Sequence, residues 1–262
     1  MDNVQKDTIR NNVRGRYKQV AIKEISIKSS CCGSSDSASF DEVSAKMGYS
    51  AEELASVPQG ANLGLGCGNP QAIAALKPGE VVLDLGSGAG FDCFLASRQV
   101  GSEGLVIGVD MTTEMVTKAR QNASKGQFTN TEFRLGEIEH LPVANDTVDA
   151  IMSNCVINLS PDKQQVFHEA FRVLKSGGRL AISDVVMTAE MPPEIRADID
   201  ATYSGCISGA SSIEELERYL QQAGFANISI TAKDESKLYI NEWLPGADID
   251  QYIVSAIIQA IK

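Results

Sequence analysis

The sequence lacks the long apolar runs that mark membrane and secreted proteins. No stretch of its 262 residues approaches the ~18 uninterrupted apolar residues that a membrane-spanning helix needs. The N-terminal segment MDNVQKDTIRNNVRGRYKQV has no apolar core of the kind found in a secretory signal. We therefore expect no membrane partner and a cytoplasmic location.

Positive charge is also scarce. The chain has 23 Lys and Arg residues against 34 Asp and Glu residues, which gives a formal net charge of −11. A surface of this sign repels phosphate backbones, so we expect no nucleic-acid partner. A neutral or cationic substrate would not be repelled.

Histidine is represented by His140 and His168 alone. We place His140 in a loop and His168 on the solvent side of a helix. No group of His, Asp and Glu residues has the spacing of metal ligands, and we expect no metal cofactor. A substrate that is an oxygen acid needs a base or a metal to remove its proton. The sequence therefore gives little support to a reaction on such a substrate.

Cysteine, by contrast, is present at six positions that need an explanation. In a reducing cytosol such residues do not form a disulfide framework, which leaves metal binding, catalysis or burial. A single cysteine is most often a small buried apolar residue, and Cys93, early in a predicted helix and facing the sheet, fits that description. The others are Cys31, Cys32, Cys67, Cys155 and Cys206.

The chain divides near residue 60 into an extension and a main domain. Residues 1–59 combine a polar helix followed by a short VAIKEISIK segment, a Ser- and Gly-rich loop with Cys31 and Cys32, and helices at 40–47 and 50–57. Ser50 and Glu53 form a capping-box pattern at the second helix. We predict that residues 60–262 form the main domain, with an irregular or helical insertion near 187–211.

From Val81 onward, predicted strands alternate with helices. The strands are VVLDL (81–85), GLVIGVD (104–110), TEFRLGE (131–137), TVDAIMSNC (147–155) and RLAISDVV (179–186). We expect the helix after the fourth strand to begin at Ser160 and to end at Gly177 and Gly178. This alternation predicts an α/β fold with a parallel, doubly wound sheet. Residues 227–233 predict a further strand, and residues 250–261 fit either a strand or a helix.

A glycine-rich turn follows the first of these strands. Gly86, Gly88 and Gly90 lie between a strand and a helix, where backbone N–H groups can approach a ligand. Phe91 stands where a dinucleotide fingerprint needs its last glycine, which argues against NAD. Asp110 ends the next strand, twenty residues after Gly90, and its carboxylate can accept both ribose hydroxyls. The pattern favours an adenosine-type cofactor.

This stretch, VLDLGSGAGFD with Asp110 after it, resembles motif I of class I S-adenosylmethionine-dependent methyltransferases over roughly residues 60–230. The resemblance implies a Rossmann-like three-layer sandwich with a mostly parallel seven-stranded sheet and an antiparallel last strand. It also implies S-adenosyl-L-methionine as the cofactor. The residues that would bind it are Asp84, Gly86, Ser87, Gly88, Gly90, Asp110, Met111, Gly136, Glu137, Ile138, Asn154 and Cys155.

Three cysteines lie in segments that can fold over one mouth of such a sheet. Cys67 is in the Gly-rich loop 60–70, Cys155 is at the carboxyl end of a central strand, and Cys206 is in the insertion. Three converging thiolates make a soft trigonal site. As(III), which carries a lone pair, fits a three-sulfur pyramid, whereas zinc would need a fourth ligand.

GLGCGNP, SNCVINLSPDKQQV and GCISGA together resemble arsenite methyltransferases. The resemblance implies that Cys67, Cys155 and Cys206 bind As(III), taken from arsenite or its thiol conjugates, in arsenic detoxification. A further catalytic cysteine would exchange disulfides with Cys67, and of Cys31 and Cys32 we favour Cys32. Thioredoxin or glutathione would be the reductant.

The implied mechanism needs no base, because the arsenic lone pair is the nucleophile and thiols reduce the oxidised arsenic. The chain departs from some members of the family at Leu65, where they have Tyr, and at Gly205, where they have Glu. It also stops shortly after the core, as in a minimal microbial version. Two alternatives stay open, namely a C-methyltransferase of quinone biosynthesis and a metalloid-binding protein without turnover.

Overall fold

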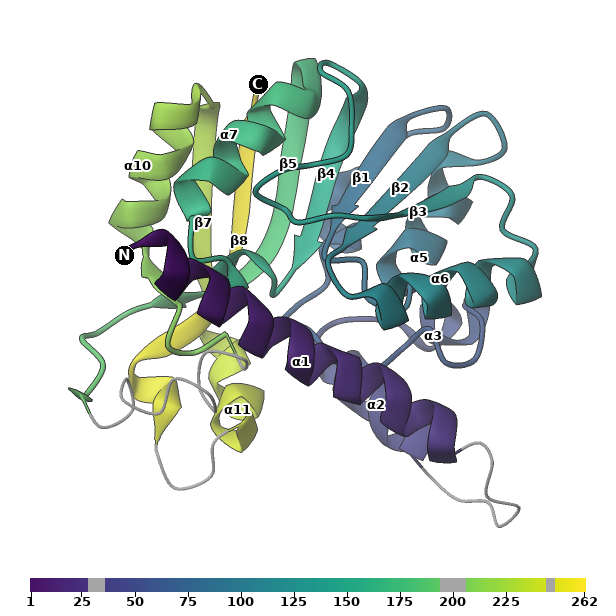
Figure 1. The fold of residues 1–262 in the computed structure, drawn as a ribbon, viewed down its shortest axis with the longest axis horizontal. Coiled ribbons are helices and arrows are strands. Elements are labelled where there is room, and N and C mark those ends of the chain that lie inside the picture. The colour runs from purple at the N-terminus through teal and green to yellow at the C-terminus, as the bar shows by residue number, and fades with distance from the viewer. Residues whose placement is uncertain (28–35, 194–205, 244–247) are drawn as a thin grey trace.

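A computed structural model describes residues 1–27, 36–193, 206–243 and 248–262. They form one sheet with the strand order β3-β2-β1-β4-β5-β8-β7, and the short strand β6 pairs with β5 beside this path (Figure 1). The strands are β1 (Val81–Leu85), β2 (Leu105–Asp110), β3 (Thr131–Leu135), β4 (Val148–Asn154), β5 (Leu174–Met187), β6 (Ser211–Ser212), β7 (Ala226–Lys233) and β8 (Ile253–Ile261).

The sheet is parallel except at β8. This strand pairs antiparallel with β5 and with β7, whereas the pairings between β3 and β5 are parallel. The predicted mostly parallel seven-stranded α/β sheet with an antiparallel last strand is therefore confirmed. Residues 250–261, for which strand and helix stayed open, supply β8, because this apolar segment fits between two strands and pairs with β5 along its length.

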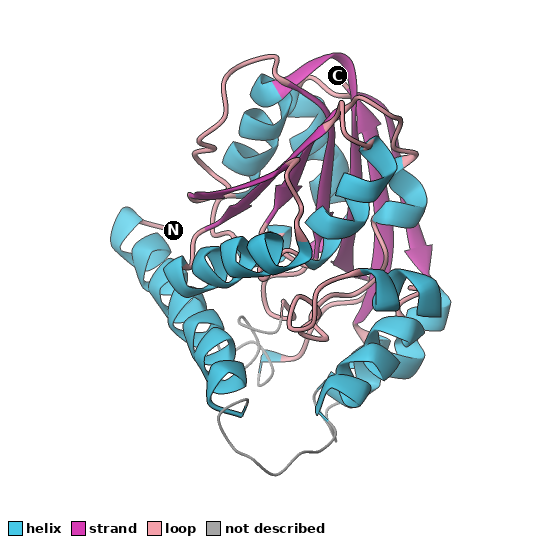
Figure 2. Ribbon diagram, turned by 90° about the vertical axis from the view of Figure 1, so that its right-hand side faces the viewer, coloured by secondary structure: helices cyan, strands magenta, loops and turns pink. Residues whose placement is uncertain are grey.

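Helices cover both faces of the sheet, which makes three layers (Figure 2). Successive side chains along β1 point to opposite faces of the sheet. Leu83 therefore packs in the apolar cluster that contains Phe167, and Val82 packs in the cluster on the other face, which contains Phe94. The helices are α1 (Asn3–Ile27), α2 (Asp36–Lys46), α3 (Ala51–Ser56), α4 (Gln71–Ala74), α5 (Phe91–Val100), α6 (Thr113–Gly126), α7 (Lys163–Val173), α10 (Ile213–Ala223) and α11 (Lys237–Ile240).

The predicted bounds of α7 were wrong at both ends. A short 3₁₀ turn occupies Ile157–Leu159, and the helix starts at Lys163 because the Asp162 side chain accepts the backbone N–H of Gln165. It ends at Val173, since Leu174 already pairs with β4, so Gly177 and Gly178 lie within β5. The capping box at Ser50 and Glu53 is present as predicted.

The N-terminal helix α1 is continuous from Asn3 to Ile27, where the sequence suggested a helix and a separate short segment. It lies across the carboxyl ends of the parallel strands (Figure 1). Val13 and Ala21 on its inner side are almost fully buried. Among the described residues, none of the helices combines the length and the apolar character needed to cross a membrane.

Candidate active site

A cavity of about 390 Å³ opens at the carboxyl ends of β1, β2 and β4. In a parallel sheet this edge is where ligands bind, because loops from neighbouring strands meet there. α1 supplies part of the wall through Arg10, Val13, Arg16, Tyr17 and Val20. Ten of the twelve residues predicted to bind the cofactor also line the cavity, namely Asp84, Gly86, Ser87, Gly88, Asp110, Met111, Gly136, Ile138, Asn154 and Cys155.

The other two predicted residues lie beside the cavity. Gly90 caps α5 with a φ of 95°, a left-handed conformation that favours glycine. Glu137 pairs with Arg14 of α1 at 3.0 Å, and Arg10 lies 3.7 Å away from it. Glu137 therefore contributes to holding α1 in place.

The glycine-rich turn orients a carboxylate toward the cavity. Asp110 accepts the backbone N–H of Gly88 at 3.0 Å through one oxygen and that of Thr112 at 2.8 Å through the other. Burial raises the pKa of Asp110, while these hydrogen bonds counteract that effect. Close by, the Ser87 hydroxyl is buried and has no hydrogen-bond partner within the described parts of the chain. An unsatisfied buried hydroxyl in a cavity wall is suited to a polar ligand.

Cys67, Cys155 and Cys206 come together in one buried cluster, and Cys155 and Cys206 also line the cavity. Their relative exposures are 0%, 8% and 2%, and they share one buried cluster with Val13 of α1. The Cys206 thiol donates to the backbone carbonyl of Cys155 at 2.8 Å. Cys155 and Cys206 both adopt left-handed backbone conformations, with φ of 59° and 67°, which are uncommon for residues other than glycine.

The loop that carries Cys67 is fixed by Asn154 at the end of β4. The Asn154 amide accepts the backbone N–H of Cys67 at 3.0 Å and donates to the carbonyl of Gly68 at 2.8 Å. It also donates to the Tyr49 hydroxyl at 3.1 Å. A Cβ atom at Gly66 would lie 2.8 Å from this amide, so glycine is needed there.

Two residues from the C-terminal part hold the same loop from the other side. The carbonyl of Cys67 accepts the hydroxyl of Tyr239 at 2.7 Å and that of Ser255 at 2.6 Å. Burial raises the pKa of Tyr239, so its hydroxyl stays a donor at neutral pH. Cys67 is therefore held by three separate parts of the fold.

All three thiols of the site titrate above their ordinary range. Burial is the main cause that raises the pKa of Cys67. The contact with Cys155 and then burial raise the pKa of Cys206. For Cys155 the contact with Cys206 lowers the pKa, but the contact with Cys67 and burial outweigh it. At neutral pH these three cysteines are therefore thiols rather than thiolates.

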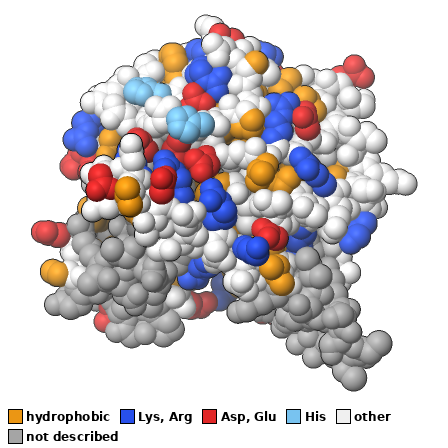
Figure 3. Space-filling model, in the orientation of Figure 1, with side chains coloured by type: hydrophobic (Ala, Val, Ile, Leu, Met, Phe, Trp, Pro, Cys, Tyr) orange, Lys and Arg blue, Asp and Glu red, His pale blue; other side chains and the backbone are white. Residues whose placement is uncertain are grey.

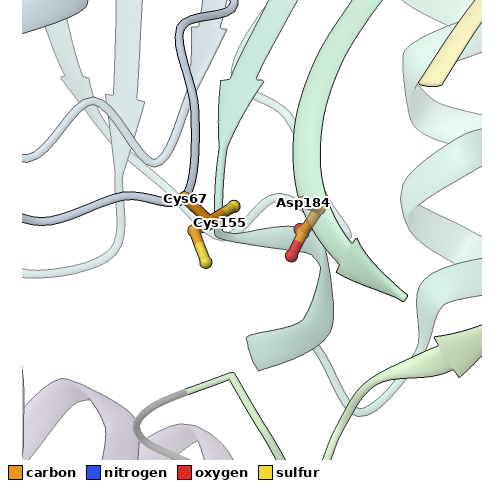
Figure 4. Close-up of side chains that lie close together, drawn as sticks. All are labelled: Cys67, Cys155 and Asp184. Atoms are coloured by element: carbon orange, nitrogen blue, oxygen red, sulfur yellow. The ribbon is translucent and has the colours of Figure 1, made fainter. Parts of the chain in front are cut away.

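Asp184 of β5 was missed by the sequence reasoning. Ligand atoms of Cys67, Cys155 and Asp184 all lie within 4.8 Å of one another (Figure 4). Burial raises the pKa of Asp184 to about 6, and the backbone N–H groups of Val185 and Ile157 lower it. The position of Asp184 in the sequence could have indicated it as a site residue, because it lies near the carboxyl end of the strand next to β4.

Cys93 and the two histidines were also singled out in the sequence, and they are not part of this cluster. Cys93 is fully buried, and its thiol donates to Asp84 at 3.2 Å. His140 lies outside the helices and strands and His168 lies on the exposed side of α7, as expected, and Figure 3 shows histidine side chains on the surface. Cys31 and Cys32 lie outside the described residues.

Comparison with known proteins agrees with this arrangement. Residues 76–224 match the family model described as "Methyltransferase domain". An arsenite methyltransferase of Halobacterium salinarum is 51% identical over 263 residues, which cover 97% of this chain and 66% of that protein. Human arsenite methyltransferase is 44% identical over 153 residues, which cover 55% of this chain and 40% of that protein. The chain thus spans about two thirds or less of the length of these curated relatives.

Among solved structures, the arsenic(III) S-adenosylmethionine methyltransferase of Chlamydomonas reinhardtii superposes with a TM-score of 0.63 at 30% identity. The match covers 84% of this chain and 73% of that one. The fold, the glycine-rich turn and these similarities all indicate a methyltransferase domain. The chain therefore belongs to the methyltransferase family, as a relative of the arsenite methyltransferases.

Proposed function

We propose that the chain is an arsenite methyltransferase, which transfers a methyl group from S-adenosylmethionine to As(III) bound by thiolates. One observation carries this proposal. Cys67, Cys155 and Cys206 come from distant segments, and their buried thiols meet beside a cavity built by the glycine-rich turn. A methyltransferase that acts on carbon or oxygen has no need for three thiols at that place.

The residues of the cavity fit S-adenosylmethionine. The Asp110 carboxylate, already oriented by two backbone N–H groups, would accept the ribose hydroxyls. The unpaired Ser87 hydroxyl would hydrogen-bond the methionine part, and a Cβ at Gly88 would meet only open space, so the backbone there is accessible. Met111 would pack on the adenine. When bound, the cofactor supplies an electrophilic methyl group.

The thiols would bind arsenite by exchange. Each thiol proton leaves with one hydroxide of As(OH)₃ as water, so three As–S bonds form and no base is required. The exchange does not need thiolates formed in advance, so the raised pKa of the buried thiols does not prevent it. The lone pair of the bound As(III) then faces the cavity, and the protein acts mainly through proximity and orientation.

The thiol chemistry that completes the cycle belongs to the same proposal. Each methyl transfer leaves arsenic formally as As(V), and two thiols that form a disulfide supply the two electrons that return it to As(III). We assign this step to Cys67 and to Cys32, with Cys31 as the alternative partner. Thioredoxin or glutathione in a reducing cytoplasm would then restore the thiols, and the whole would serve arsenic detoxification.

The test is incubation of the purified full chain with arsenite, S-adenosylmethionine and a thiol reductant, followed by speciation of the arsenic products. Methylated arsenic should form, and Cys67→Ser, Cys155→Ser and Cys206→Ser should each abolish it. Cys93→Ser, a buried thiol outside the site, is the matched control.

Two outcomes would overturn the proposal. Full activity in all three site variants would leave a methyltransferase of another acceptor class, such as one of quinone biosynthesis. Arsenite binding without any calorimetric binding of S-adenosylmethionine would point to a metalloid-binding protein without turnover.

A further inference from the structure

The thiol site contains a fourth donor that As(III) does not need. A carboxylate oxygen of Asp184 lies within 4.8 Å of the sulfur atoms of Cys67 and Cys155, and all three residues are buried (Figure 4). In a three-sulfur arsenic site the lone pair occupies the fourth position, so this carboxylate is not required as a ligand. Its presence calls for a separate explanation.

The hydrogen bonds of Asp184 fix it in place and leave it able to coordinate. Its Oδ1 accepts the side-chain amide of Asn158 at 2.9 Å and the backbone N–H of Val185 at 2.8 Å. Its Oδ2 accepts the backbone N–H of Ile157 at 2.8 Å. The backbone N–H of Asn158 also acts on this carboxylate, which has about four acceptor positions, so a bound cation would replace one of these contacts. Outer hydrogen bonds of this type hold the carboxylate ligands of metal sites.

Thiophilic divalent ions without a lone pair have different requirements from As(III). Zn²⁺ and ions like it prefer four ligands in a tetrahedron, drawn from Cys sulfur, His nitrogen and Asp or Glu oxygen. Cys67, Cys155 and Asp184 provide three donors of these types. Water could fill the fourth position, or the nearby Cys206 thiol after a side-chain movement, since that thiol donates to the backbone carbonyl of Cys155.

We propose that the thiol site also binds one thiophilic divalent cation, of the zinc and cadmium type, through Cys67, Cys155 and Asp184, and that this cation excludes arsenite. Binding releases the thiol protons to solvent and involves no change of oxidation state. The cation and As(III) share the sulfur ligands Cys67 and Cys155, so one displaces the other. Asp184 distinguishes them, because the divalent ion alone uses the carboxylate.

Cadmium is a suitable probe, because Cd²⁺ bound to thiolates has an ultraviolet charge-transfer band. The full chain would be titrated with CdCl₂ in a phosphine reductant, in a background of Cys31→Ser and Cys32→Ser that removes two competing thiols. We expect one Cd²⁺ per chain and loss of the band when arsenite is added. Cys155→Ser should abolish the band, and Cys93→Ser should leave it unchanged.

Asp184→Asn is the decisive variant. It should weaken Cd²⁺ binding by at least about tenfold more than it weakens arsenite binding. Arsenite binding that persists in the variant also shows that the variant is folded. Equal Cd²⁺ affinity in the variant and the unmodified chain would overturn the proposal.

A second measurement needs no change at Asp184. The ¹¹³Cd NMR shift of the bound ion in the same background distinguishes a ligand set of sulfur alone from one that includes oxygen. The mixed set is expected, and a shift typical of sulfur alone would refute a role for Asp184. The inference uses the thiols of the proposed function but not methyl transfer, so a failed methylation assay with successful Cd²⁺ binding would overturn the proposed function alone.

Discussion

At the residue scale, Asn154 supports the thiol site without being one of its thiols. The resemblance to methyltransferases implied that Asn154 binds the cofactor. In the structure it lines the cavity, but its amide is occupied by the loop backbone at Cys67 and Gly68. We therefore interpret Asn154 as a positioning residue for the Cys67 thiol.

Replacing Asn154 by Ala should lower the rate of arsenite methylation by about 10-fold to 100-fold, because hydrogen bonds that hold the Cys67 loop are lost. The KM for arsenite should rise more than the KM for S-adenosylmethionine. Steady-state kinetics with each substrate varied in turn would measure this difference. Asn154→Asp, which keeps the acceptor for the Cys67 N–H, should be intermediate, whereas equal effects on both KM values would contradict a positioning role.

Asp92 gives a prediction about pH. Burial raises its pKa to about 6, while the hydrogen bond from Tyr49 lowers it. A carboxyl whose pKa is raised in the folded state stabilises the fold most at pH values below its unfolded pKa of about 4. This contribution disappears as the pH rises through about 6.

We therefore expect Asp92→Asn to change the pH dependence of stability in a defined direction. Relative to the unmodified chain, the variant should gain on the order of 2–3 kcal/mol in the free energy of unfolding between pH 4 and pH 7. Chemical denaturation without ligands would measure it. A constant difference across this range would show that Asp92 does not titrate as described.

At the scale of elements, α1 depends on charge for its position over the cavity. Arg10 lies 3.2 Å from Glu139, Arg14 lies 3.0 Å from Glu137, and Lys18 lies 2.9 Å from Glu114. Lys6 forms a further pair with Asp162. These pairs are partly exposed, so each contributes little, but together they align one helix with the loops after β2, β3 and β4.

Salt should therefore loosen α1. We expect the KM for S-adenosylmethionine to rise severalfold from low to high ionic strength, because the cofactor pocket loses part of its wall. In a chain with Arg10→Gln and Arg14→Gln, this KM should already be high at low salt and should change little as salt is added. Lys262→Gln, which removes an ion pair with Asp146 away from the cavity, is the control. An unchanged salt response in the double variant would contradict this account.

At the scale of the whole molecule, the sheet separates two apolar cores. Phe167 of α7 and Phe94 of α5 are both fully buried, one in each core. Each Phe→Ala substitution should lower the free energy of unfolding by about 3–5 kcal/mol, through lost burial and the cavity that remains.

Because the two side chains do not share a cluster, their effects should add within about 0.5 kcal/mol in the double variant. Urea denaturation would measure all three proteins. Leu238→Ala is the control, since Leu238 is 82% exposed and should change stability little. A large coupling energy would mean that the cores are not independent.

The sequence by itself determined the alternation of strands and helices, the glycine-rich turn and the placement of Asp110 at the end of β2. These features are local, because the period of apolar residues and the chemistry of turns are set by neighbours along the chain. The same local information put Cys155 after a central strand. It failed at the start of α7, where Asp162 rather than Ser160 provides the cap.

The tertiary structure alone decided that Cys67, Cys155 and Cys206 meet, that Asp184 joins them and that α1 covers the cavity. Each of these depends on contacts between residues far apart in the chain, such as Ser255, which lies 188 residues after Cys67 and hydrogen-bonds to its carbonyl. Such contacts follow from the strand order and from the packing of the closed core. No local period encodes them, because a residue's neighbours in sequence do not specify its neighbours across the sheet.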